Sequence, residues 1–131
     1  RSARVRAISY LLDNCLVLKD SYAYLIVSKE IKRKFGIREG ELEGLVNIPL
    51  TIKRIKVSIT LTEDNGCYRV SLRSKRGINV NRLATGSFHG GHEQASGGKL
   101  FLESDITSAR DIPAYVEGCT ARFLQSTAKR I

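Results

Sequence analysis

Two runs of alternating residues on either side of a turn constrain the fold of this 131-residue chain most strongly. From Ile55 to Leu61 apolar residues alternate with Lys, Ser and Thr, and from Tyr68 to Ser74 they alternate with Arg and Ser. A period of two is typical of a strand with one buried face and one polar face. The intervening Asp64-Asn65-Gly66 favours a tight turn. We therefore predict a β-hairpin that carries Arg73 on its polar face.

Other apolar patterns predict two further strands and two long helices. The continuous run from Tyr22 to Val27 is typical of a strand covered on both faces, which we expect to be central in the sheet. Lys99 to Leu102 fits a last strand. Apolar residues spaced three and four apart predict a first helix from Ala3 to Cys15 and a final helix from Ile112 to Lys129.

Shorter helical signals lie between the first strand and the hairpin. Ser28 suits the N-cap and Gly36 the stop of a basic helix over Lys29 to Phe35, whose cations face either a nucleic acid or solvent. From Glu41 to Pro49 apolar residues recur at a helical spacing, which Gly44 weakens. These elements predict an α/β (α+β) fold, a single domain with a mixed β-sheet of about four to five strands packed by helices.

Composition limits the class of partner and the compartment. Lys and Arg number 22 against 13 acidic residues, and the formal net charge of +9 favours polyanions as partners. The three cysteines are far apart and form no CxxC spacing, so neither a disulfide framework nor a zinc site is indicated. No apolar run reaches the length of a membrane span, and no signal-peptide core follows the first residues. We expect a cytoplasmic protein without a membrane partner.

The stretch from Val70 to Gly98 combines features that suit a phosphate-bearing ligand. Arg73 leaves its strand on the polar face and can bind an anion through two N–H groups. The Gly90-Gly91-His92 turn lets backbone N–H groups approach a ligand closely, and a helical turn opening at His92 would add a favourable field. Asn79 suits the cap of a short helix from Val80 to Ala84. Each feature alone is usually only a turn, a solvated arginine or a cap, so the hypothesis rests on their combination.

Several short motifs follow one another here in a fixed order. They are Leu72-Arg73-Ser74, Ile78-Asn79-Val80-Asn81, Leu83-Ala84, Gly90-Gly91-His92 and Ala95-Ser96-Gly97. In this order they resemble the C-terminal DHH-associated domain of the DHH phosphoesterases, and the segment from Gly40 to Asn47 is similar to the oligoribonuclease and phosphoadenosine-phosphatase branch. The family usually shows three or four glycines before the histidine, whereas this chain has two.

The resemblance implies the substrate-binding half of a manganese-dependent phosphoesterase that hydrolyses short single-stranded oligonucleotides or small nucleotide phosphates. The substrate-binding residues that it implies are Arg73, Ser74, Asn79, Gly90, Gly91, His92 and Ser96. In the family the metal ions and water-activating aspartates lie in an N-terminal domain with an Asp-His-His tripeptide, which this chain lacks. Residues 1–131 are therefore expected to be a C-terminal fragment of a larger phosphoesterase, with no catalytic residue, metal site or cofactor of its own. The N-terminal DHH catalytic domain is the expected partner, and a homodimer is left open.

Other interpretations of these residues remain. His89 and His92 form an H-x-x-H pair, but no carboxylate or cysteine cluster completes a metal site, so we assign His92 to phosphate and treat His89 as incidental. Phe88 is the aromatic residue nearest the glycine turn and a candidate for stacking on a base. The main alternative function is a non-catalytic nucleic-acid module of the tRNA-binding type found at the end of alanyl-tRNA synthetases. A structural domain that only pairs subunits is a further possibility.

Overall fold

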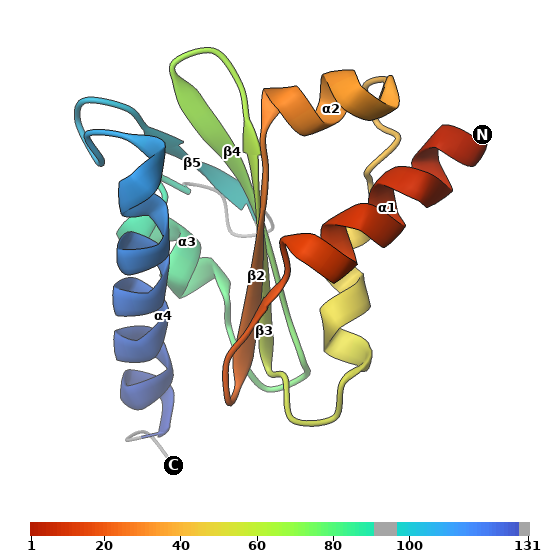
Figure 1. The fold of residues 1–131 in the computed structure, drawn as a ribbon. Coiled ribbons are helices and arrows are strands. Elements are labelled where there is room, and N and C mark those ends of the chain that lie inside the picture. Colours follow the sequence, from red (N-terminus) through yellow and green to blue (C-terminus); the bar gives the residue numbers. More distant parts are fainter. Residues whose placement is uncertain (91–96, 129–131) are drawn as a thin grey trace.

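The computed structural model of the chain describes residues 1–90 and 97–128. Its centre is a five-stranded sheet with the order β1-β2-β3-β4-β5 (Figure 1). The strands are β1 (Val17–Leu18), β2 (Tyr22–Val27), β3 (Val57–Glu63), β4 (Cys67–Ser74) and β5 (Gly97–Phe101). Strands β2 and β3 are parallel, and the other neighbours are antiparallel. The prediction of an α/β domain with a mixed sheet is confirmed.

The predicted hairpin is formed by β3 and β4. In its register Thr60 lies opposite Ser71 and Thr62 lies opposite Arg69. Alternate residues of β4 are buried and exposed, because its apolar side chains enter the core while Arg69, Ser71 and Arg73 stay on the other face. The sheet therefore has a polar area over β3 and β4.

Helices cover both faces of the sheet. The α-helices are α1 (Ser2–Asn14), α2 (Lys29–Phe35), α3 (Asn81–Ser87) and α4 (Ile112–Ala128), and the 3-10 helices are η1 (Leu45–Thr51) and η2 (Ala109–Asp111). Helices α3 and α4 lie on one side, and α1, α2 and the segment of η1 lie on the other (Figure 1). The long first and last helices were predicted within two residues of their ends. None of the helices in residues 1–90 and 97–128 is both long and apolar enough to cross a membrane.

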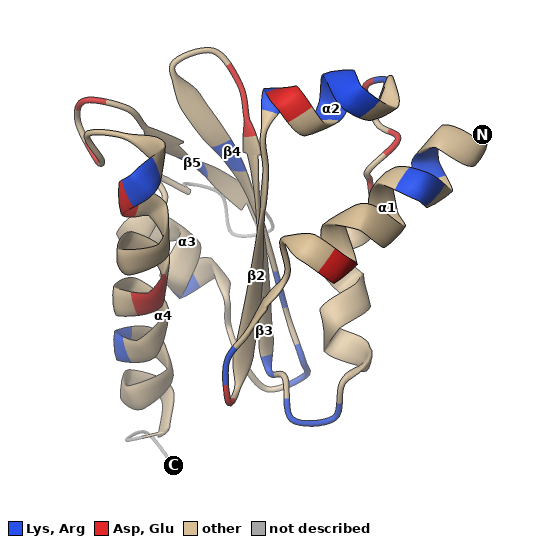
Figure 2. Cartoon of the chain, in the orientation of Figure 1, with Lys and Arg blue, Asp and Glu red and all other residues tan. Residues whose placement is uncertain are grey.

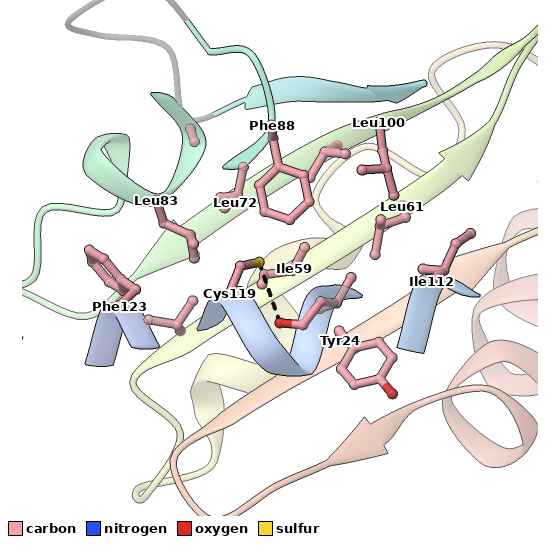
Figure 3. Packing of buried hydrophobic residues seen from close by; sticks show 14 of the residues in the cluster. Tyr24, Ile59, Leu61, Leu72, Leu83, Phe88, Leu100, Ile112, Cys119 and Phe123 are labelled. Atoms are coloured by element: carbon pink, nitrogen blue, oxygen red, sulfur yellow. Dashed lines mark hydrogen bonds between the residues drawn. The ribbon is translucent and has the colours of Figure 1, made fainter. Parts of the chain in front are cut away.

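The two sides of the sheet have separate hydrophobic clusters. The larger cluster joins β2 to β5 with α3 and α4, and Phe88, Leu72 and Leu100 all point into it (Figure 3). The smaller cluster centres on Leu11 of α1, on β2 and on η1. In this second layer η1 packs against β3 and β4, and the part of the polar face of β3, β4 and β5 that lies between η1 and α2 borders a cleft.

Four local predictions need correction. The predicted helix from Glu41 to Pro49 is a 3-10 helix that begins at Leu45, because Gly40 (φ 83°) and Gly44 (φ 88°) are left-handed and interrupt an α-helix. In α1 the buried residues include Ala7 and Leu11, whereas Val5 of the predicted apolar stripe is 61% exposed.

Strand β2 is an inner strand, as expected, but β3 is the central one, because the two-residue β1 adds an edge that no periodic pattern predicts.

Glu41 also differs from its expected place in a helical first turn. It accepts the backbone N–H of Arg38 at 2.7 Å and the guanidinium of Arg1 at 2.6 Å. The hydrogen bond from Arg1 contributes most to lowering the pKa of Glu41 to about 2.

Candidate ligand-binding cleft

A cleft of about 760 Å³ lies over the polar face of the hairpin. Its floor is formed by β3, β4 and β5, and its wall by α2 and by the segment between α2 and η1. The polar and charged residues that line it are Lys32, Arg38, Glu39, Glu43, Thr60, Thr62, Asp64, Arg69, Ser71, Arg73 and Lys99. The cleft thus lies between the polar face of the sheet and the residues of the second helical layer that form its wall.

Strand register gathers these side chains on one surface. Thr60 and Ser71 face each other across β3 and β4, and Lys99 of β5 lies opposite Arg69. Because side chains on one face recur every second residue, Arg69, Ser71 and Arg73 follow one another along the cleft floor. The two hydroxyl-bearing residues lie between cations, an arrangement that can donate hydrogen bonds to an anion.

The charge of the cleft is positive. Five of its lining residues are Lys or Arg and three are acidic, and Figure 2 shows basic positions on α2, β4 and β5. Asp64 lies 3.5 Å from the guanidinium of Arg69, so part of the positive charge is compensated. The backbone N–H of Asn65 is the main cause of a lowered pKa at Asp64, which keeps that carboxylate ionised. The remaining excess of cations favours an anionic ligand.

Arg73, Ser74 and Asn79 lie where β4 ends and the chain turns towards α3. The Arg73 side chain is on the cleft floor, and its Nη1 donates to the carbonyl of Leu72 at 2.8 Å. The hydroxyl of Ser74 donates to Ile78 O at 2.7 Å, and Asn79 Oδ1 accepts the backbone N–H of Asn81 at 3.2 Å. Arg73 therefore faces the cleft, whereas the other two side chains stabilise the turn and the start of α3.

Glycines allow β5 to lie close to the segment after α3. A Cβ at Gly90 would lie 2.9 Å from both Ala84 Cβ and Gly97 O, and a Cβ at Gly98 would lie 2.1 Å from Phe88 O. Gly97 pairs with Ser71, which lies two residues before Arg73 in β4, and the next two residues of β5, Gly98 and Lys99, line the cleft. The predicted ligand contacts of Gly91, His92 and Ser96 lie outside the described residues.

Two neighbouring aromatic groups differ from what the sequence predicts. Phe88, the candidate for base stacking, is fully buried in the larger cluster, so it has no face to offer a ligand. His89, treated as incidental, is left-handed (φ 57°), and its Nε2 lies 2.9 and 3.0 Å from the two oxygens of Asp105. This contact joins His89 to the loop after β5.

Several residues of the cleft had not been singled out from the sequence. They are Arg38, Thr60, Thr62, Arg69, Ser71 and Lys99. The alternation that placed Arg73 on the polar face applied equally to its neighbours in β3 and β4, so this signal was present. In the ranges 1–90 and 97–128, no group of three or more His, Cys, Asp or Glu side chains is arranged to hold a metal ion.

Comparison with known proteins identifies the family. The DHHA1 domain matches residues 19–113, and the chain belongs to this family of DHH-associated domains. The resemblance noted in its motifs is therefore confirmed, and members of the DHH family with this domain include hydrolases.

Two bacterial proteins named as hydrolases are similar in sequence. The "probable bifunctional oligoribonuclease and PAP phosphatase NrnA" of Streptococcus mutans is 33% identical over 94 residues, which are 71% of this chain and 30% of that protein. The "bifunctional oligoribonuclease and PAP phosphatase NrnA" of Bacillus subtilis is 29% identical over 97 residues, 74% of this chain and 31% of that protein.

A solved structure has the same fold. An "exopolyphosphatase-related protein" from Bacteroides fragilis superposes with a TM-score of 0.84 and 34% identity, over 98% of this chain and 37% of that one. The chain therefore spans about a third of the length of each of these relatives.

Proposed function

We propose that this chain is the substrate-binding domain of a DHH-family phosphoesterase that hydrolyses short oligonucleotides or small nucleotide phosphates. Membership of the DHHA1 family and the names of the two sequence relatives support this substrate class. The observation that carries the proposal is the cationic cleft, with Arg73 on its floor and the glycine-bounded end of β5 beside it.

Each part of the cleft has a role in this proposal. The planar guanidinium of Arg73 binds two oxygens of one phosphate at once, which a point charge does less well. The sequence motif Gly90-Gly91-His92 is assigned to the same phosphate, and the hydroxyl of Ser71 adds a donor. Arg69 lies four residues from Arg73, about 13 Å along β4, so a ligand with more than one phosphate can use both cations.

Hydrolysis itself is assigned to another part of the enzyme. The metal ions, which we expect to be manganese, and the aspartates that activate water belong in this proposal to an N-terminal DHH catalytic domain. Bound metal would supply the attacking hydroxide and stabilise the charge that develops on the phosphate. The residues of the present chain would hold and orient the substrate in the cytoplasm, and they would not turn it over alone.

The test compares two arginines of equal charge in different places. Arg73 is on the cleft floor, whereas Arg110 is exposed on η2 and does not line the cleft. Loss of a charge-assisted contact costs about 1.5 to 3 kcal/mol, so Arg73→Ala should weaken binding of a 5′-phosphorylated dinucleotide by about 10- to 150-fold. Arg73→Lys keeps the positive charge but loses the planar guanidinium that binds two oxygens at once. Its affinity should therefore lie between those of the parent and Arg73→Ala. Arg110→Ala should bind like the parent.

Isothermal titration calorimetry at one salt concentration measures the affinity of the parent and of the three variants for the dinucleotide. Equal weakening by Arg73→Ala and Arg110→Ala would mean that only total charge matters, which contradicts a phosphate site at Arg73. Tighter binding of folded tRNA than of the dinucleotide would instead favour the alternative, a nucleic-acid module of the tRNA-binding type.

A further inference from the structure

The polar sheet face continues beyond the cleft to an exposed aromatic side chain. Leu100 of β5 is buried in the core, so alternation along the strand places Lys99 and Phe101 on the opposite face. Lys99 lines the cleft, and Phe101 follows it at the end of β5. The exposed large apolar side chains of the described residues are Val5, Leu18 and Phe101, and Phe101 is 37% exposed. Of these three side chains, Phe101 is aromatic and lies next to a residue that lines the cleft.

The Phe101 ring is held in place by its surroundings. The ring of His89 meets it edge to face, with centroids 5.2 Å apart and an angle of 69° between the planes. His89 is itself fixed by Asp105, and the same carboxylate accepts the backbone N–H of Phe101 at 2.7 Å. Burial opposes ionisation of Asp105, but the hydrogen bonds from Phe101 and His89 keep its pKa below the ordinary value. The two rings are therefore ordered before any ligand arrives.

An ordered and partly exposed aromatic face next to a cation suits one class of ligand group. Nucleobases stack on aromatic side chains with little regard to sequence, because every base has a π-face. Within the described ranges Lys99 forms no ion pair, so its ammonium is available to a phosphate. Lys99 and Phe101 are two residues apart, about 7 Å along the strand, a distance that a ribose can bridge.

We propose that Phe101, backed by His89, is a nucleobase subsite at the β5 end of the cleft, so that this domain selects nucleotides over inorganic polyphosphate. The inference rests on the proposed function and adds the part of the ligand that is not phosphate. It is informative because one relative is named as an oligoribonuclease and another as an exopolyphosphatase-related protein. A polyphosphate chain has no group that can use an aromatic face, whereas it can use the cations of the cleft equally well.

Three probes separate the base from the phosphates. Isothermal titration of the 131-residue chain uses 5′-phosphorylated diadenylate, the same molecule with tetrahydrofuran in place of each base-bearing sugar, and inorganic tripolyphosphate. One base on one aromatic ring is worth about a tenfold change in affinity, at the lower end of measured values. The parent should therefore bind diadenylate about tenfold more tightly than the abasic probe.

Conservative variants distinguish stacking from packing. Phe101→Leu keeps an apolar side chain at the end of β5 but lacks the π-face, so it should lose the preference for diadenylate and bind the other two probes like the parent. Phe101→Tyr keeps the π-face and should retain the preference. His89→Asn removes the second ring at a position where asparagine tolerates the left-handed backbone, and it should lose part of the preference.

The outcomes separate this inference from the proposed function. If Phe101→Leu binds diadenylate like the parent, or weakens all three probes equally, the ring is only structural and the subsite is refuted while the phosphate site stands. If the parent binds none of the probes, the proposed function fails and the subsite fails with it. A thermal melt of each variant confirms that the compared proteins are folded.

Discussion

Replacing Gly98 with alanine tests whether close packing of β5 against the segment after α3 holds the end of the cleft in place. A Cβ at this position would lie 2.1 Å from Phe88 O and 2.9 Å from Phe88 C, closer than the 3.0 Å below which real Cβ atoms are essentially never found. The obstacle is backbone, so no side-chain rotation relieves it. Strand β5 must move away from Phe88, and this movement breaks the hydrogen bond of 2.7 Å from Lys99 N to Phe88 O.

The expected cost has two parts. Overpacking a filled site costs about 1 to 3 kcal/mol, and a lost backbone hydrogen bond costs about 0.5 to 1.5 kcal/mol. Gly98→Ala should therefore lower the free energy of unfolding by about 1.5 to 4.5 kcal/mol, a large share of a typical domain's stability. For a chain of this length the melting temperature should fall by about 7 to 15 °C. Urea denaturation followed by far-UV circular dichroism measures the free energy directly.

Two other glycines serve as matched controls. A Cβ at Gly97 would meet only Val70 O, at 3.2 Å, so Gly97→Ala should cost clearly less than Gly98→Ala. A Cβ at Gly86 in α3 would have no neighbour within 4 Å, and Gly86→Ala should stabilise the protein by about 0.5 to 1 kcal/mol through a better helix propensity. If the free energy of unfolding of Gly98→Ala is within about 0.5 kcal/mol of that of the parent, the packing argument is refuted.

Two further predictions concern acid stability and catalysis. The pKa of Asp105 is lowered in the folded protein, so its stabilising contribution is present above the ordinary value of 3.8 and is lost as pH falls through the folded value. The difference in urea midpoint between the parent and Asp105→Asn should therefore shrink as the pH is lowered from 6 towards 2, because Asp105 becomes protonated in the parent. A difference that does not change with pH would contradict this prediction. The purified chain with manganese should release no mononucleotide from a short oligonucleotide, and turnover that one Asp or Glu substitution in this chain abolishes would show that hydrolysis occurs here.

Local and periodic signals explain what the sequence predicted correctly. The hydroxyl of Ser28 accepts the N–H of Ile31 at 3.2 Å, and Gly36 ends α2 in the left-handed conformation (φ 61°), as their residue types indicated. The apolar stripe of α4 was also predicted, and Val116 and Phe123 are among its buried members. Such features depend on neighbours within one turn of helix or on a strict period, so a single sequence contains them.

Features that depend on contacts between distant segments were not predictable in this way. Phe88 and Phe101 lie on either side of the Gly90–Gly98 segment in the sequence, yet the first is fully buried and the second is 37% exposed. Their difference arises because Phe88 packs against Tyr115 of α4 in the core, whereas Phe101 follows the buried Leu100 and therefore lies on the opposite face of β5. In the same way, alternation placed Thr60 on the polar face, but the cleft above it exists because α2 and the segment between α2 and η1, which are distant in sequence, form its wall.

The contacts that order Phe101 also occupy backbone amides at the β5 edge of the sheet, where a strand of another chain could otherwise pair. The amides of Lys99 and Phe101 point away from β4, and they are already bonded to Phe88 O and to the carboxylate of Asp105. An edge strand with unbonded amides is a template on which another chain can add a strand, the first step of many forms of aggregation. At the opposite edge, β1 has only two residues. The protein can therefore present an open, polar sheet surface to its ligand without offering either edge of that sheet for polymerisation.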